Sequence, residues 1–220
     1  SLDANQSGSN NVAFGINSLS SNTTASDNTA IGAGAMDGNT TGSQNTAVGR
    51  GSLDVNTTGS NNNAVGHNCL DANTTGGYNN AVGQNALGAN TEGNYNVAMG
   101  QDALANNTTA SNNVGIGRSA LVANTTGYQN TAVGALALDA NTEGFENTAV
   151  GYNCLSDVTT GDHNTAIGHD ALENVSTGSY NNALGRDAGR NITTGSSNIC
   201  IGQNAADADN HIGVVAVGSF

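Results

Sequence analysis

Residues 45–61 read Asn-Thr-Ala-Val-Gly-Arg-Gly-Ser-Leu-Asp-Val-Asn-Thr-Thr-Gly-Ser-Asn, and a similar stretch begins again at Asn62. The glycine that closes the Ala-Val-Gly step recurs every 17 residues, twelve times without insertion or deletion. These glycines are Gly15, Gly32, Gly49, Gly66, Gly83, Gly100, Gly117, Gly134, Gly151, Gly168, Gly185 and Gly202. Self-similarity at one fixed period is typical of a chain built from stacked copies of a single structural unit.

Each repeat is numbered here from this glycine, which is position 0. A large apolar residue stands at −1, a small residue (usually Ala) at −2, and Asn at −4 in all twelve copies. Position +4 is Leu or Met in ten copies, and a small residue precedes it. The consensus from −10 to −7 is Asn-Thr-Thr-Gly.

The repeat is too short and too rich in glycine for a pair of helices. Asn-Thr-Ala-Val-Gly is typical of a short strand, the Ala-Leu stretch predicts a second, weaker strand, and Asn-Thr-Thr-Gly predicts a turn. The fold class is therefore all-β: a parallel β-roll or β-solenoid of about 13 coils with 17 residues each. At about 4.8 Å per coil this predicts a rod roughly 60 Å long. We expect the solenoid over residues 1–205 and a terminal coil or transition segment over 206–220.

In a solenoid with constant register, the Asn residues at −4 form a column of amides that can hydrogen-bond along the axis. We expect this structural ladder at Asn45, Asn62, Asn79, Asn96, Asn113, Asn130, Asn147 and Asn164.

The thin core predicts an oligomer. Each coil offers one Val-sized side chain, one Leu-sized side chain and two alanines, which is little apolar area against the entropy of ordering 17 residues. Both faces of the first strand avoid charge, so we expect one face inside the roll and the other against a partner chain.

Composition excludes several classes of function. The chain has no Pro or Trp, 31 Gly, and a net charge of −13 from 17 carboxylates against four basic residues. Nucleic-acid binding needs a basic face, which is missing. No apolar run is long enough to span a membrane, so membrane insertion is not expected, and no signal peptide is recognisable. The mid-repeat start at Ser1-Leu2 and the decaying pattern at the other end fit a fragment or processed piece.

No constellation of residues predicts catalysis, because every polar residue type recurs in register. We therefore expect no enzyme activity, no cofactor and no metal. Small residues of the coil interior are replaced by Cys69, Cys154 and Cys200, which predicts buried thiols. The histidines His67, His163, His169 and His211 are expected on the surface, although symmetry copies of one His could bind an ion in a trimer.

Charged side chains fit a surface role. Aspartates recur at +5 (equivalently −12 from the next glycine), where we expect them to stabilise a turn, with weak Ca²⁺ binding as the alternative; they are Asp3, Asp37, Asp54, Asp71 and Asp139. Three of the four arginines, Arg50, Arg118 and Arg186, share position +1. Turn sequences such as Asn22-Thr23-Thr24 are glycosylation acceptors only in a host that glycosylates.

Aromatic side chains gather at −6 and −5, between the turn and the strand. They are Tyr78, Tyr95, Tyr128, Phe145 and Tyr180. Such rings could contact a receptor or stack on a glycan, or they could form an aromatic ladder that stiffens a corner.

The strand motif, as in Asn45-Thr46-Ala47-Val48-Gly49 or Asn164-Thr165-Ala166-Ile167-Gly168, resembles the head repeat of YadA-like trimeric autotransporter adhesins. The full repeat is still more similar to arrays in bacteriophage tail fibres and bacterial surface proteins. The resemblance covers residues 1 to about 205 and implies a left-handed roll and a homotrimer. The coil departs from the adhesin pattern, which has 14 residues where this chain has 17.

Repeat and resemblance together predict a structural and adhesive fibre segment, extracellular, in a virion tail fibre or cell-surface appendage. Its partners are expected to be two copies of itself and a host-surface glycan or protein receptor. The alternative is an ice-binding solenoid, since Thr recurs at −9 and mostly at −8. Adjacent Thr residues would point to opposite faces, and Glu92 and Glu143 interrupt one column.

Overall fold

The computed structural model describes residues 2–205 and 212–218 and is all-β, with 13 parallel strands of three residues, one per turn of about 17 residues. The chain divides into two compact units, residues 1–112 and 113–220. The described residues contain no helix, and therefore none that could cross a membrane. The predicted parallel β-solenoid with a 17-residue turn is confirmed.

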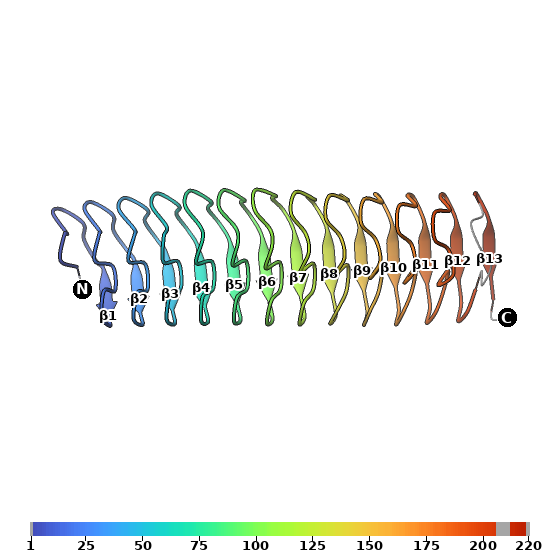
Figure 1. Cartoon of the computed structure of the whole chain (residues 1–220), viewed down its shortest axis with the longest axis horizontal. Coiled ribbons are helices and arrows are strands. Elements are labelled where there is room, and N and C mark those ends of the chain that lie inside the picture. The colour runs from blue at the N-terminus through green and yellow to red at the C-terminus, as the bar shows by residue number, and fades with distance from the viewer. Residues whose placement is uncertain (1, 206–211, 219–220) are drawn as a thin grey trace. The chain divides into compact units, whose positions relative to one another are not determined.

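The first unit holds six strands, which pair side by side in chain order (Figure 1). They are β1 (Val12–Phe14), β2 (Thr29–Ile31), β3 (Thr46–Val48), β4 (Asn63–Val65), β5 (Asn80–Val82) and β6 (Val97–Met99). Each strand covers positions −3 to −1, within the Asn-Thr-Ala-Val-Gly stretch predicted as a strand, and each residue pairs with the residue 17 positions later.

The second unit holds seven strands, which also pair in parallel in chain order. They are β7 (Val114–Ile116), β8 (Thr131–Val133), β9 (Thr148–Val150), β10 (Thr165–Ile167), β11 (Asn182–Leu184), β12 (Ile199–Ile201) and β13 (Val215–Val217). Paired residues are 17 positions apart up to β12, whereas β12 and β13 pair 16 positions apart, as Ile199 does with Val215. Strand β13 extends the solenoid into the segment expected to be a terminal coil or transition. Residues 206–211, 219 and 220 of that segment, with His211 among them, lie outside the described residues.

The interior of each coil is lined by small and medium-sized side chains. The Ala at −2 points inward and is fully buried in most strands, as are the small residue at +3 and the Leu or Met at +4. The residues at −3 and −1 point outward, so the Val-sized side chain at −1 is not part of the single chain's core. A coil therefore buries even less apolar area than the sequence predicts.

The predicted second strand is wrong. The Ala-Leu stretch consists of consecutive turns, because two residues in it adopt a left-handed backbone that an extended strand does not allow. In the coil that contains Leu53, Gly51 has φ 64° and Leu53 has φ 51°. The stretch still pairs with the next coil, for example through the Leu53 N–H, which donates to the Cys69 carbonyl at 3.0 Å.

Position 0 requires glycine for two separate reasons. Its φ lies between 118° and 148°, a region that side chains rarely tolerate. The coils are also stacked so closely that an added Cβ would collide with the backbone of the next coil. At Gly134 this Cβ would lie 2.1 Å from the Gly151 carbonyl oxygen. The repeat glycine thus determines how closely the coils can approach.

We predict that Gly134→Ala destabilises the protein by at least about 3 kcal/mol, because strained backbone and a backbone clash act together. Gly34→Ala is the matched control, since its Cβ would meet only Asp54 Oδ1, at 3.8 Å, and its φ is 68°. The control should cost about 1 kcal/mol. Urea unfolding followed by circular dichroism measures both. Equal losses in the two variants would contradict the close-approach argument.

The Asn at −4 forms a buried column along the coils of each unit. The Asn45 Oδ1 accepts the Asn62 backbone N–H at 2.9 Å, and the Asn45 Nδ2 donates to the Gly59 carbonyl at 2.8 Å. The same pair of bonds recurs in other coils, and some neighbouring amides also bond directly, as Asn96 and Asn79 do at 3.2 Å. The side chain therefore mainly satisfies backbone groups of the following coil.

A second buried column lies at −10, where the sequence indicates only a turn. In the first unit each Asn donates to the Oδ1 of the Asn one coil earlier and to the carbonyl at −7 of its own coil, as Asn90 does at 2.9 Å and 3.1 Å. In the second unit the column changes from Asn to apolar residues at Val158, Val175 and Ile192. The Asn141 Oδ1, which precedes this change, is buried and has no hydrogen-bond partner among the described residues.

We predict that Asn90→Val costs about 1–3 kcal/mol more than Asn141→Val. The first substitution leaves the Asn73 Oδ1 and the Asn107 Nδ2 without the partner they have in the ladder. The second removes an amide whose oxygen already lacks a partner, so only its donated bond to the Asn124 Oδ1 is lost from the ladder. The midpoints of urea unfolding measure the difference, and equal costs would contradict the ladder's contribution.

Candidate functional site

The outward face of the strands is an uncharged, partly apolar surface in each unit. It consists of positions −3 and −1, and no described strand residue there is charged. Exposure is large for several apolar side chains, with Met99 at 45%, Leu184 at 51% and Ile167 at 42%. In the second unit, Ile167, Leu184, Ile199 and Ile201 help to line an apolar hollow of about 220 Å³. We call this face the outer strand face.

The predicted aromatic residues of the second unit form a continuous row. The ring centroids of Tyr128 and Phe145 lie 4.9 Å apart and stacked, Phe145 meets His163 edge-on at 5.2 Å, and His163 stacks on Tyr180 at 4.7 Å. In the first unit Tyr78 stacks on Tyr95 at 4.9 Å.

Rings at the same position in successive coils lie about one strand spacing apart, close to the ideal stacking distance. The row of the second unit changes from −6 at Tyr128 and Phe145 to −5 at His163 and Tyr180, and the contact at this change is edge-on. Inner ring faces are therefore covered by neighbouring rings. A glycan could stack only on the free face at the end of a row, or touch ring edges. The geometry favours a ladder that stiffens the corner, and the His163 Nε2 also lies 3.1 Å from a Glu146 carboxylate oxygen.

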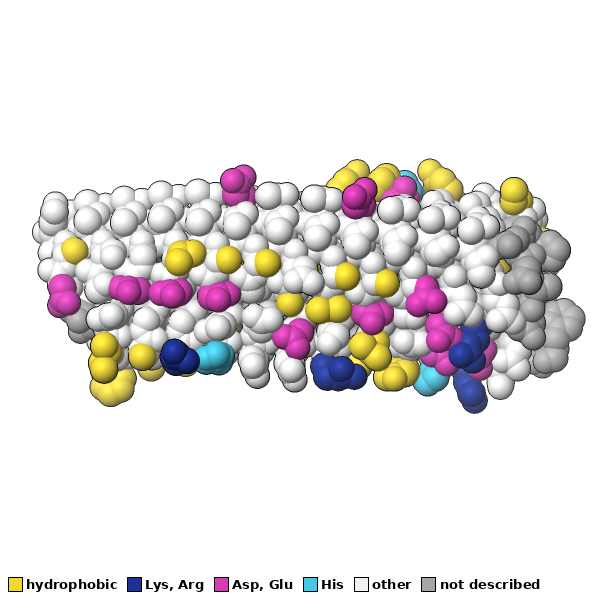
Figure 2. All heavy atoms as spheres, viewed as in Figure 1, with side chains coloured by type: hydrophobic (Ala, Val, Ile, Leu, Met, Phe, Trp, Pro, Cys, Tyr) yellow, Lys and Arg dark blue, Asp and Glu magenta, His cyan; other side chains and the backbone are white. Residues whose placement is uncertain are grey.

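Carboxylates and arginines share another side of the coil, where acidic side chains form a row in the first unit (Figure 2). Position +5 supplies Asp37, Asp54 and Asp71 in consecutive coils. Burial raises the pKa of Asp54 and of Asp71, and the neighbouring carboxylate raises each further. The aspartates that recur at this position therefore place like charges one coil apart.

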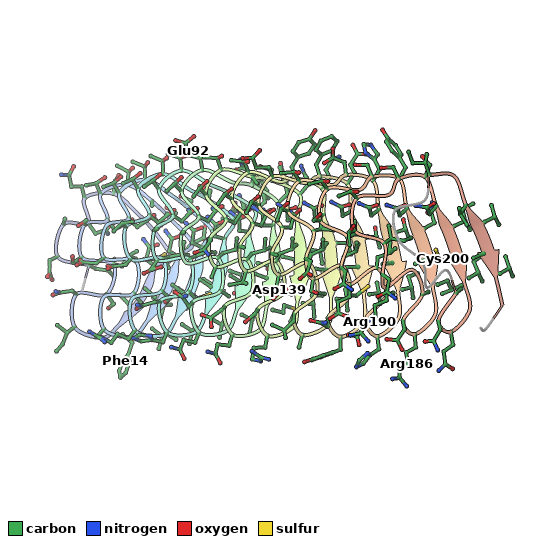
Figure 3. All side chains as sticks on the ribbon, turned by 45° about the vertical axis from the view of Figure 1, so that its right-hand side comes forward. Phe14, Glu92, Asp139, Arg186, Arg190 and Cys200 are labelled. Carbon is green, nitrogen blue, oxygen red and sulfur yellow. The ribbon has the colours of Figure 1, made fainter. Side chains whose placement is uncertain are left out.

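In the second unit three groups, His169, Asp170 and Asp187, have ligand atoms within 4.8 Å of one another. Two arginines form ion pairs with this cluster. The Arg190 Nη1 lies 3.3 Å from the Asp187 Oδ1, and the Arg186 Nε lies 3.0 Å from the Asp187 Oδ2. Arg190 also contacts Asp170, at 4.0 Å. Guanidinium groups thus supply the positive charge that a metal ion would bring, and the cluster is an ion-pair network. Figure 3 shows both arginines at the lower edge.

The other histidines and arginines that the structure describes lie on the surface or at its edge, as predicted. His67 and His169 are exposed at +1, and Arg50 approaches His67 with its Nη1 at 3.4 Å from Nε2. Arg118 is exposed at the same position. His163 is half-buried in the aromatic row.

The threonine columns bear on the ice-binding alternative. At −9 the hydroxyl donates to the Thr carbonyl of the next coil, as Thr40 does to Thr57 at 2.9 Å and Thr57 to Thr74 at 2.9 Å. These hydroxyl groups therefore donate within the protein and not to water or ice. Only the exposed column at −8 faces solvent, and Glu92, which points outward in Figure 3, interrupts it. A single interrupted column gives little regular surface for ice.

The three cysteines are free and buried. The Cys69 thiol donates to the Ala81 carbonyl and the Cys154 thiol to the Ala166 carbonyl, both at 3.2 Å. Burial raises the pKa of both thiols to about 12 and also raises that of Cys200. The neutral thiol is therefore the native form at neutral pH, which makes these groups poor nucleophiles and poor metal ligands.

We expect the native protein to react with a thiol-specific disulfide reagent at pH 8 at least about 100-fold more slowly than the urea-unfolded protein, because the thiolate fraction is very small. The absorbance of the released thiolate measures both rates. Rapid labelling of even one native cysteine would show that its coil opens or that its thiol is accessible.

Two structural features are not evident from residue types, one in the interior and one on the surface. The buried Asn column at −10 lies in a stretch whose sequence predicts only a turn. The one feature of the sequence that indicates the column is that Asn recurs at −10 without exception from Asn22 to Asn141. A hollow in the first unit depends on Gly34 and Gly51, which are ordinary glycines in a chain with 31 of them.

Comparison with known proteins adds no relative: no family model, no curated protein and no solved structure matches this chain.

Proposed function

We propose that this chain is a structural and adhesive segment of an extracellular fibre, from a phage tail fibre or a bacterial surface adhesin. In this proposal three copies associate as left-handed rolls, in register, and present or contact a host receptor. The handedness, the number three and the setting rest on the repeat's resemblance to trimeric adhesin heads and phage fibres.

The observation that carries the proposal is the outer strand face. A net charge of −13 is distributed over the chain, yet the outward strand positions of both units are uncharged and expose Val, Ile, Leu and Met. Extended apolar surface on a single chain marks an interaction site. Because the face repeats with every coil, a second copy of the chain can pack against it coil by coil. Homo-oligomers usually associate with closed symmetry.

The thin interior supports the same proposal. Within one coil the apolar core is limited to positions −2, +3 and +4, and much of the remaining interior is Asn. Burying the −1 side chains of neighbouring copies adds apolar area that the single chain leaves in water, at about 25 cal/mol per Å². Recurrent columns, rather than one unique constellation, also suit a mechanical role better than catalysis.

We predict that the native chain elutes as a species of three times the 21.7 kDa chain mass in size-exclusion chromatography with light scattering at micromolar concentration. Val133→Glu should reduce this mass, since it places a carboxylate on the outer strand face of every copy. Thr126→Glu is the matched control, because the same position one coil later is already Glu143 and is exposed. A folded monomer for the native chain, or equal behaviour of the two variants, would refute association through this face.

A further inference from the structure

A polar hollow of about 290 Å³ opens on the first unit, on the side of the coil that carries positions +1, +2 and +5. Its polar lining comes from Asn17, Arg50, Asp54 and Asn68, with Asp37 at one side. Ile16, Ala33, Gly34 and Gly51 complete the lining. All of these residues belong to one chain and one unit, so the hollow does not require association of copies.

Two glycines create the hollow. Position +2 is Asn at Asn17, Asn68 and Asn85, but Gly34 and Gly51 occupy it in the two coils between Asn17 and Asn68. All these positions share a left-handed backbone, with φ 68° at Gly34 and 50° at Asn68, so the coil path is unchanged and only the side chains are missing. A Cβ at Gly34 would meet nothing closer than the Asp54 Oδ1 at 3.8 Å.

Several polar groups around the two glycines have no protein partner. At some other pairs of +2 positions, adjacent side chains bond to each other, as the Asn85 amide does to Asp102 at 3.0 Å and the Asn153 amide to Asp170 at 3.1 Å. By contrast, the side chains of Asn17, Asn68 and Asp54 have no hydrogen-bond or ion-pair partner among the described residues. The hollow therefore presents acceptors and donors that are directed at solvent.

We propose that this hollow binds a saccharide unit, that is, a small neutral molecule rich in hydroxyl groups. A hydroxyl both donates and accepts, which suits a lining that combines two carboxylates, two amides and one guanidinium. The Arg50 guanidinium argues against a bare metal ion, and the volume, at the lower end of the range for ligand pockets, suits a single sugar ring. Ile16 and Ala33 offer apolar contact to the C–H face of the ring.

The proposal goes beyond the fibre function and locates a contact away from the aromatic rows. It is tested by saturation-transfer NMR with the methyl glycosides of glucose, galactose, mannose and N-acetylglucosamine as probes. The variant Gly34→Asn/Gly51→Asn restores the side chain found at position +2 in neighbouring coils and fills the hollow. At Gly51 the new Cβ would approach only the flexible end of Asn68, at 2.8 Å from its Oδ1, so the coil should still form.

We expect the native chain to give a saturation-transfer signal with at least one glycoside, and the double variant to reduce it at least tenfold while its circular dichroism and unfolding midpoint stay native-like. Asp54→Asn should also weaken binding. Asp71→Asn, in the same column one coil later and outside the lining, is the matched control and should bind as the native chain does.

Absence of signal with all four probes would overturn the proposal, as would an undiminished signal in the double variant. The latter result, combined with loss of signal in Tyr78→Ala/Tyr95→Ala, would assign glycan contact to the aromatic stack of the first unit instead. The mass measured by light scattering is a separate readout. If the protein is a monomer and still binds the glycoside, the proposed trimer is wrong and the proposed saccharide site is supported.

Discussion

Close contact between successive backbones at position 0 is the constraint on which the rest of the structure depends. The repeat glycine sits so near the carbonyl of the following repeat glycine that even a methyl group cannot be placed between them. That contact brings every other position opposite its equivalent in the next coil. The columns of Asn, Ala, Leu and aromatic residues are consequences of this register, because each side chain meets a copy of itself one strand spacing away.

Given that register, a core with much amide and little aliphatic volume can still be satisfied. An isolated buried amide would be costly, but here both Asn columns give their donors and acceptors partners in the same or the adjacent coil. The break at Asn141 shows the opposite case, where the column changes residue type and one oxygen loses its donor. The interior is thus specified by directional bonds more than by the volume of its side chains.

The period, the strand at −3 to −1, the parallel pairing and the Asn column at −4 could be predicted from the sequence, because repetition of residue types at fixed spacing is visible without any structure. The turns around Leu53 could not, since leucine in a left-handed backbone runs against its intrinsic preference and is imposed by the stacked coils. Alternation predicted two strand faces but not which one turns inward. The polar hollow depends on the side chains that Gly34 and Gly51 lack, and no local pattern indicates such an absence.

Contacts in this fold link each repeat almost entirely to its immediate neighbours, as the bonds between residues 17 positions apart show. During evolution such a chain can gain or lose complete 17-residue repeats. Duplication of one complete repeat inserts a strand and one rung in every column, and the coils on either side meet the same partners as before. Genetic recombination between repeats can therefore lengthen or shorten the protein without designing a new interior.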